Sequence, residues 1–319
     1  MKNYLIFTTL LLIFSCEKDE IPITPHLMGE IKTTQIDMGD DYSKQVFFNL
    51  EKNEVISENL KTKWDIAFEA SESGYNIILN SSKFSKVSEI TNMNFLDNIL
   101  VQNLDWQWEN PNGINYGSAI GDYTNKNSFY VVDNGFNLNG INNGFTKFII
   151  DSVNNNYYKI RYSNLDNTDE DSATIYKDNN KNFIFFSFQN KIVDIEPEKN
   201  NWDLVFTQYT HLFNNPLFPP SYLVTGVLTN YVNNVEVTLD TTTLFEEINY
   251  ENINSLIFSD KQNEIGYNWK NWTGSEYTIN TNYTYIIKSV SDRYFKLRFI
   301  DFYNSNGERG FPKFEFQEL

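Results

Sequence analysis

The same pattern of residues occurs twice in this chain, about 138 positions apart. Residues 46–50 and 64–68 each have a counterpart 138 positions later, and residues 148–153 and 157–162 each have one 137 positions later. Four matches in chain order at nearly one spacing exclude chance similarity. Because this period is far longer than that of a solenoid or a propeller blade, the repeat predicts two tandem domains.

The repeat divides the chain into four segments. We expect a signal peptide at residues 1–15, a tether at residues 16–35, a first domain at residues 36–178 and a second domain at residues 179–319. Aromatic residues make up 16% of the chain, which gives each unit enough apolar surface to offset the entropy of ordering.

Alternation of residue type predicts strands in both units. Residues 157–162 and 294–299 each place Lys and Arg on one face and apolar residues on the other. Asn-rich junctions such as residues 304–307 predict turns between strands. Residues 243–246 fit a capping box that opens a short helix, with residues 90–102 as the counterpart in the first unit. The expected fold class is mainly β: two tandem antiparallel-sheet domains with at most a short helix each.

The N-terminus is typical of a lipoprotein signal peptide. An apolar run at residues 5–14 is followed by Ser15 and Cys16, the only cysteine, and this junction resembles the lipobox in which the cysteine is acylated. Residues 17–20 resemble the surface-export signal of Bacteroidota lipoproteins, with a solvated tether as the alternative interpretation. We therefore expect lipidation of Cys16 and an outer membrane lipoprotein exposed at the cell surface, with the membrane as a partner through the lipid anchor.

Charge and residue content argue against several functions. The net charge of −17 repels phosphate backbones, so no nucleic acid partner is expected. The chain has two histidines, no Gly-rich phosphate loop and no nucleophile elbow, so we expect no enzyme, no catalytic residue and no metal site. The acidic run at residues 166–171 lacks the glycine and the final glutamate of an EF-hand, which favours a solvated loop.

A Trp-Asp pair occurs at the same place in both units, at residues 64–65 and 202–203. Because both copies keep it, we interpret the pair as structural, with the indole in the core and the carboxylate capping a turn. Trp106 and Trp108 lie two positions apart and would share one strand face, either as core residues or as a stacking platform.

The second unit contains an insertion. Between the Trp-Asp pair and the next shared asparagine, Asn80 in the first unit and Asn230 in the second, the second unit is 12 residues longer. The extra residues include the apolar, proline-rich run 211–220. Two interpretations stay open: a binding loop on a rigid scaffold, or a plug that folds over the end of the sheet.

The second unit resembles the HmuY family of Bacteroidota in its motifs at residues 186–188, 201–207, 265–270, 294–304 and 310–312. This family consists of mainly-β, lipid-anchored surface proteins and is named for a haemophore that takes haem from host haemoproteins. The resemblance covers about 140 residues and implies a fold and a place at the cell surface. The first unit resembles the family more weakly.

The resemblance also implies haem as a ligand, but the family's iron ligands do not carry over. The named haemophore uses two histidines, and some relatives use methionine. Here His26 lies in the tether, His211 is the one histidine of the second unit, and all four methionines lie outside that unit. Haem would then be held by His211 alone, by stacking on aromatic rings, or by a tyrosinate. The candidate tyrosines are Tyr209, Tyr222, Tyr267 and Tyr277.

The candidate binding residues combine the histidine, the inserted loop and the later aromatic residues of the second unit. They are His211, Phe213, Leu217, Phe218, Tyr222, Tyr267, Trp269 and Trp272. The expected function is capture of haem or a related ligand without catalysis, with a haemoprotein as a partner. The alternative is an adhesion module that binds a glycan or a protein through the same loop and tryptophans and does not bind haem.

Overall fold

The computed structural model describes residues 27–124 and 126–319. The predicted signal peptide and Cys16 lie outside these residues. The described residues contain 22 strands, and all their pairings are antiparallel, which confirms the predicted mainly-β class. In the same part of the chain no helix has the length and apolar character needed to cross a membrane.

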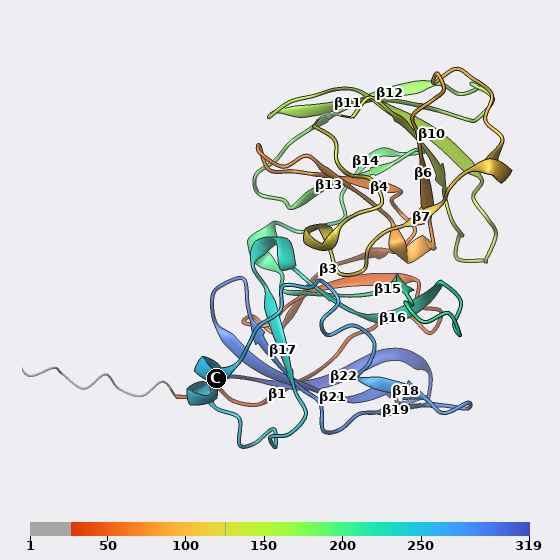
Figure 1. The fold of residues 1–319 in the computed structure, drawn as a ribbon. Coiled ribbons are helices and arrows are strands. Elements are labelled where there is room, and N and C mark those ends of the chain that lie inside the picture. Colours follow the sequence, from red (N-terminus) through yellow and green to blue (C-terminus); the bar gives the residue numbers. More distant parts are fainter. Residues whose placement is uncertain (1–26, 125) are drawn as a thin grey trace, which may run out of the picture.

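Two sheets pack face to face to form what we call the first sandwich, drawn at the top of Figure 1. Its six-stranded sheet consists, in spatial order, of β12 (Asp171–Tyr176), β11 (Tyr157–Ser163), β10 (Phe145–Val153), β9 (Phe129–Asp133), β6 (Lys86–Ile90) and β7 (Gln107–Trp108). Its five-stranded sheet consists of β14 (Lys191–Val193), β13 (Phe183–Ser187), β4 (Ile66–Glu69), β5 (Asn76–Leu79) and β8 (Gly121–Asp122).

The second sandwich, at the bottom of Figure 1, also has two main sheets. The five-stranded sheet consists of β1 (Lys32–Gln35), β22 (Arg309–Glu318), β21 (Tyr294–Tyr303), β20 (Thr284–Lys288) and β17 (Glu236–Asp240). The four-stranded sheet consists of β16 (Ser221–Thr229), β15 (Leu204–Leu212), β2 (Lys44–Asn49) and β3 (Glu54–Leu60). A small hairpin of β18 (Lys270–Trp272) and β19 (Tyr277–Ile279) lies beside them.

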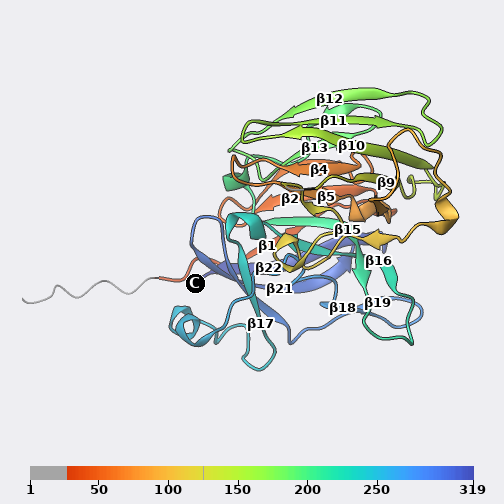
Figure 2. The ribbon, with the colours of Figure 1, turned by 45° about the horizontal axis from the view of Figure 1, so that its top comes forward.

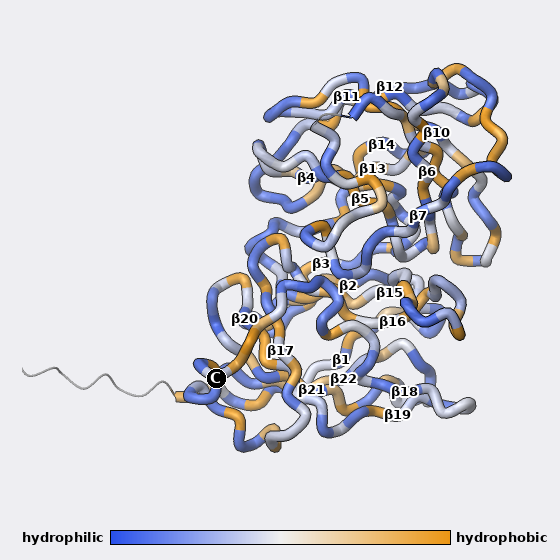
Figure 3. The backbone as a smooth tube through the Cα atoms, viewed as in Figure 1, coloured by the Kyte–Doolittle hydropathy of each residue, from blue (hydrophilic) through white to orange (hydrophobic). Residues whose placement is uncertain are grey.

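The two sandwiches stack into four layers (Figure 2). A third apolar cluster lies between the inner sheets and joins Ala67 and Phe185 of the first sandwich to Phe47 and Val205 of the second. In Figure 3, apolar and polar segments both occur along the strands of the two sandwiches. This agrees with sheets that each have one or two faces in an apolar layer.

The sandwiches exchange strands. β2 belongs to the first unit of the sequence but pairs with β15, with Phe48 opposite Leu204. β13 belongs to the second unit but pairs with β4, with Phe186 opposite Ile66. The two pairings have the same register, because each member of one lies 138 positions from its equivalent in the other. Each unit therefore gives its first hairpin, β2–β3 or β13–β14, to the sheet of the other.

The predicted boundary between residues 178 and 179 does not match these sheets. The core of the second sandwich includes Val46 and Leu50, and the core of the first includes Phe186. The division into two sequence units stays a prediction, while each folded sandwich combines residues from both units.

The aspartates of the two Trp-Asp pairs fasten the exchanged hairpins. Asp203 Oδ2 accepts a hydrogen bond from the backbone N–H of Leu50 at 2.8 Å, and Asp65 Oδ2 accepts one from Phe188 at 2.7 Å. Both indoles are buried in the apolar layer between the sandwiches. A buried indole and a carboxylate bound to backbone N–H groups agree with the structural interpretation of this motif.

The six helices of the described residues are short 3-10 turns. They are η1 (Ser81–Lys83), η2 (Val101–Asn103), η3 (Ile114–Tyr116), η4 (Lys199–Asn201), η5 (Tyr231–Asn233) and η6 (Tyr250–Ser255). The capping box expected at residues 243–246 opens no helix, and residues 90–102 contain only the start of η2. At residues 245–248 the buried Lys296 Nζ instead donates to the carbonyl oxygens of Phe245 at 2.7 Å and Ile248 at 2.8 Å.

Candidate functional site

The inserted residues of the second unit lengthen one hairpin. The pairing of β15 with β16 begins at Leu204 opposite Thr229 and continues to Leu212 opposite Ser221. At the tip of the hairpin, the Phe213 N–H donates to the Pro220 carbonyl oxygen at 3.1 Å. At this tip the side chain of Leu217 is 88% exposed. The tip therefore projects from the sandwich and does not plug the end of the sheet.

The hairpin forms one wall of a groove of about 620 Å³, which we call the aromatic groove. Its lining includes the aromatic residues Tyr42, Phe213, Tyr222, Tyr267, Trp272 and Tyr277, together with Lys270 and Arg309. Four of the eight predicted site residues, Phe213, Tyr222, Tyr267 and Trp272, thus line one groove. Its volume is in the range of small-molecule sites.

The opposite wall of the groove is held close to β16 by backbone contacts. The N–H of Val227 donates to the Gly266 carbonyl oxygen at 2.9 Å, and the N–H of Gly266 donates back at 3.0 Å. A Cβ on Gly226 would lie 2.4 Å from that same carbonyl oxygen, so only glycine allows this approach. The contact fixes the position of Tyr267, which follows directly.

His211 lies behind the groove. Its ring contacts Phe213 edge-on with centroids 4.8 Å apart and Tyr267 with centroids 5.1 Å apart, and it opens toward a separate hollow that Trp108 also lines. Burial lowers the pKa of His211, which favours the neutral imidazole that binds metals. Its Nδ1 atom is buried and has no hydrogen-bond partner.

The two tryptophans predicted for the site differ in position. Trp269 is 1% exposed, stacks on Phe299 with centroids 4.0 Å apart and donates its indole N–H to the Gly266 carbonyl oxygen at 3.2 Å. It is a core residue, and the expected ligand contact through Trp269 is wrong. Trp272 is 53% exposed and packs against Tyr277 in the groove.

Leu217 and Phe218 lie at the hairpin tip and do not line the groove. Phe218 is 54% exposed, and its ring stacks on that of Phe213 with centroids 5.2 Å apart. The tip thus presents an apolar surface that is separate from the groove but joined to it through Phe213.

Lys270 is a groove residue that the sequence analysis missed. Its Nζ atom donates to the Thr225 carbonyl oxygen at 2.5 Å and lies 4.1 Å from the centroid of the Trp269 ring. Burial lowers the pKa of this amine to about 7. Within the described part of the chain it forms no ion pair with a carboxylate. A signal was present in the sequence, because the lysine lies between the two tryptophans.

Trp106 directly precedes β7 and Trp108 ends it, so only Trp108 lies on a strand, but both indoles approach the same lysine. The Nζ atom of Lys86 lies 5.0 Å from the ring centroid of Trp106 and 5.9 Å from that of Trp108. Both indoles are half-buried, and Trp106 also packs on Phe145. The lysine therefore occupies the face that a stacking ligand would need.

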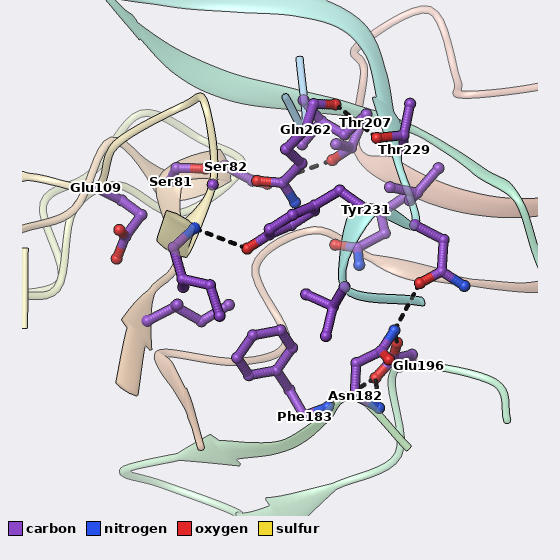
Figure 4. Close-up of a pocket in the computed structure, with 18 of the residues that line it drawn as sticks. Ser81, Ser82, Glu109, Asn182, Phe183, Glu196, Thr207, Thr229, Tyr231 and Gln262 are labelled. Atoms are coloured by element: carbon purple, nitrogen blue, oxygen red, sulfur yellow. Dashed lines mark hydrogen bonds between the residues drawn. The ribbon is translucent and has the colours of Figure 1, made fainter. Parts of the chain in front are cut away.

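A second cavity, of about 90 Å³, lies between the sandwiches (Figure 4). Glu196 faces it, and its carboxylate accepts hydrogen bonds from the backbone N–H groups of Asn182 at 3.1 Å and Phe183 at 3.0 Å. Burial raises the pKa of Glu196 to about 7. The Tyr231 hydroxyl accepts from the Ile114 N–H at 3.0 Å. The cavity has room for a few waters and is too small for a ligand of ordinary size.

Among residues 27–124 and 126–319, no three His, Cys, Asp or Glu side chains group as a metal site. In the acidic run, Asp166 accepts hydrogen bonds from Thr168 within a turn.

Comparison with known proteins agrees with the motifs of the second unit. Residues 179–316 match the family model described as HmuY protein. The second unit is HmuY-like. No curated protein matches the chain.

Solved structures similar to this HmuY-like chain include apo PinO from Porphyromonas gingivitis, with 11% identity over 91% of this chain and 97% of that one, at a TM-score of 0.37. A putative HmuY-like heme-binding protein from Bacteroides vulgatus is 12% identical over 90% of each chain, at a TM-score of 0.23. A putative lipoprotein from Bacteroides fragilis is 18% identical over 53% of this chain and 92% of that one, at a TM-score of 0.24. These values are too low for an argument about function.

Proposed function

We propose that this HmuY-like protein is a lipid-anchored binding protein at the cell surface that captures haem or a related ligand, without catalysis, in the aromatic groove. The observation that carries the proposal is the pairing of aromatic walls with two basic side chains, Lys270 and Arg309, in a chain whose net charge is −17. The rings offer stacking contacts to a flat apolar ligand. The cationic forms of the two basic side chains attract its acidic groups.

The candidate iron ligands differ in how accessible they are from the groove. Tyr222 is 59% exposed and lines the groove, so it is the accessible tyrosine. Burial raises the pKa of Tyr267 and Tyr277, which disfavours their tyrosinate forms, and Tyr209 is buried and outside the lining. His211 reaches the groove only if the ring of Phe213 or Tyr267 moves.

Titration of haemin into the full-length protein lacking its signal peptide tests this proposal. We expect a shifted, saturable Soret band. Tyr222→Phe and His211→Ala should each be compared with Tyr176→Phe, a control at an exposed tyrosine of β12 in the other sandwich. The substitution that removes the iron ligand should change the Soret spectrum, while the control Tyr176→Phe should leave it unchanged. The absence of any saturable band contradicts the haem proposal.

An adhesion module is the second candidate, and the exposed Leu217 and Phe218 at the hairpin tip favour it. The double variant Leu217→Ser with Phe218→Ser should then abolish binding to cells or to a glycan array while the melting temperature stays nearly unchanged. Phe213 is left intact in this variant because its ring contacts both His211 and Phe218. Retained binding after the double substitution would argue against this candidate.

A further inference from the structure

The first sandwich has a groove of its own, of about 490 Å³, which we call the amide groove. It lies where the loop between β9 and β10, the end of β11 and the turn of the exchanged hairpin β13–β14 meet. It shares no residue with the aromatic groove. An inference drawn here therefore does not depend on haem capture.

Side-chain amides dominate the lining of the amide groove. They belong to Asn134, Asn137, Asn143, Asn164, Gln189 and Asn190. An amide carries both donors and acceptors, as does a hydroxyl group of a sugar. Asn137 and Asn164 already use part of theirs within the protein, so the exposed Gln189 and Asn190 offer the most open amides. The lining therefore complements a ligand rich in hydroxyl groups.

Four charged residues line the groove: Lys63 and Asp169 are exposed, while Lys83 and Asp65 are paired. Lys83 Nζ forms a buried ion pair with Asp65 Oδ1, and Asp65 Oδ2 accepts from the Phe188 N–H at 2.7 Å. This pair leaves no buried cation that requires an anionic ligand. The groove thus favours a ligand without net charge.

One buried polar atom of the groove lining has no partner in the described part of the chain. Asn134 is about nine-tenths buried; its Nδ2 atom donates to Thr146 Oγ1 at 2.9 Å, while its Oδ1 atom is buried without a hydrogen bond. A buried acceptor left unpaired destabilises the protein, because it has lost its hydrogen bonds to water without replacing them. A ligand hydroxyl that displaces the groups covering this atom would satisfy it.

Two half-buried rings, Phe145 and Phe188, border the groove and offer apolar contact to the C–H face of a sugar ring. From the amides, the paired base and the unpaired Asn134 oxygen, we propose that the amide groove binds a neutral sugar of one or two rings. The site is separate from the aromatic groove and gives the first sandwich a binding function of its own.

Saturation-transfer difference NMR on the full chain tests this proposal with galactose, mannose, fucose, N-acetylglucosamine and lactose as probes, and with N-acetylneuraminic acid as an anionic counterpart. We expect saturation transfer to at least one neutral sugar. Gln189→Ala combined with Asn190→Ala should weaken that binding at least tenfold. These two side chains are exposed and make no hydrogen bond with any described residue, so the fold should survive their removal.

Gln102→Ala combined with Asn103→Ala is the matched control, because this pair is also exposed and lies outside the groove. The control and Trp272→Ala should both keep sugar binding. Asn134→Leu should abolish it. The proposal is overturned if no neutral sugar gives a signal, if only N-acetylneuraminic acid does, or if the signal survives in the Gln189 and Asn190 variant. Failure of haemin to bind would leave this result unaffected.

Discussion

Asp203 accepts a hydrogen bond from the backbone N–H of Leu50 at 2.8 Å, across 153 residues of sequence. Its other oxygen accepts from the N–H of Val290 at 2.9 Å. One buried carboxylate thus joins the end of β2, the start of β15 and the turn after β20. Asp65, its equivalent in the first unit, instead directs one oxygen to the buried Lys83. The two aspartates look alike in the sequence but have different partners.

This difference predicts unequal losses of stability. Asp65→Ala leaves Lys83 buried without a counter-ion and should lower the free energy of unfolding by about 3–5 kcal/mol. Asp203→Ala leaves two backbone N–H groups unpaired and should cost about 2–3 kcal/mol. Urea unfolding measures both. Adding Lys83→Met to Asp65→Ala should recover part of the loss, and no recovery would show that the ion pair is not the cause.

The strand exchange predicts that residues 179–319 do not fold alone. This fragment lacks β2, so β15 loses a neighbouring strand and the core loses Val46 and Phe48. We expect no cooperative unfolding transition by circular dichroism. Addition of a peptide covering residues 28–62 should restore one. A sharp transition of the fragment without the peptide would contradict the importance of the exchange.

The raised pKa of Glu196 should make the stability of the protein depend on pH. Burial raises its pKa from 4.5 to about 7, so the folded protein binds this proton more tightly than the unfolded chain does. The free energy of unfolding should therefore fall as the pH rises from about 4.5 to about 7, by up to about 3 kcal/mol from this group. Glu196→Gln should remove that part of the dependence, whereas Glu198→Gln, at an exposed position, should not.

Lys270 predicts a pH dependence of ligand binding. Burial lowers the pKa of its amine to about 7, so the ammonium form that attracts an anion is lost as the pH rises through that value. The affinity for haemin should weaken between about pH 6 and pH 8. Lys270→Met should show a flatter profile than the unchanged protein in the same titration. Equal slopes would show that the amine does not contact the ligand.

Lipidation of Cys16 would anchor the protein to the membrane, which a substitution can test. Cys16→Ala should move it from the membrane to soluble fractions. Protease added to whole cells should degrade the lipidated form, because we propose that it faces outward. Protection from the protease would indicate a periplasmic location and argue against surface export.

Strand content was readable from the sequence because single strands leave a local pattern. The alternation at residues 157–162 and 294–299 corresponds to β11 and β21, with Ile160 and Leu297 on buried faces. Pairing between distant strands has no such local signal. The repeat identified β2 and β13 as equivalent, but either assignment of partners, within a unit or between units, gives the same pattern in the sequence.

The residues of the candidate site could likewise be predicted only in part from the sequence. Trp269 and Trp272 lie three positions apart in one motif, yet one is buried on Phe299 and the other is half exposed beside Tyr277. Composition favoured aromatic side chains as contacts, which was sufficient for Tyr222 and Trp272. It did not favour Lys270, because the desolvation that lowers the pKa of this amine depends on its distant neighbours Thr225 in β16 and Phe302 in β21.

The pairing of β1 with β22 bears on how such a chain crosses a membrane. Thr34, near the start of the described residues, lies opposite Phe314, almost at the other end of the sequence. A chain threaded through a translocation channel from its N-terminus would present β1 and β2 long before their partners emerge. During that interval β1 cannot pair with β22, and β2 cannot pair with β15. Under the proposed export, these early strands would therefore keep unpaired edges open to wrong pairings until the last strand had arrived.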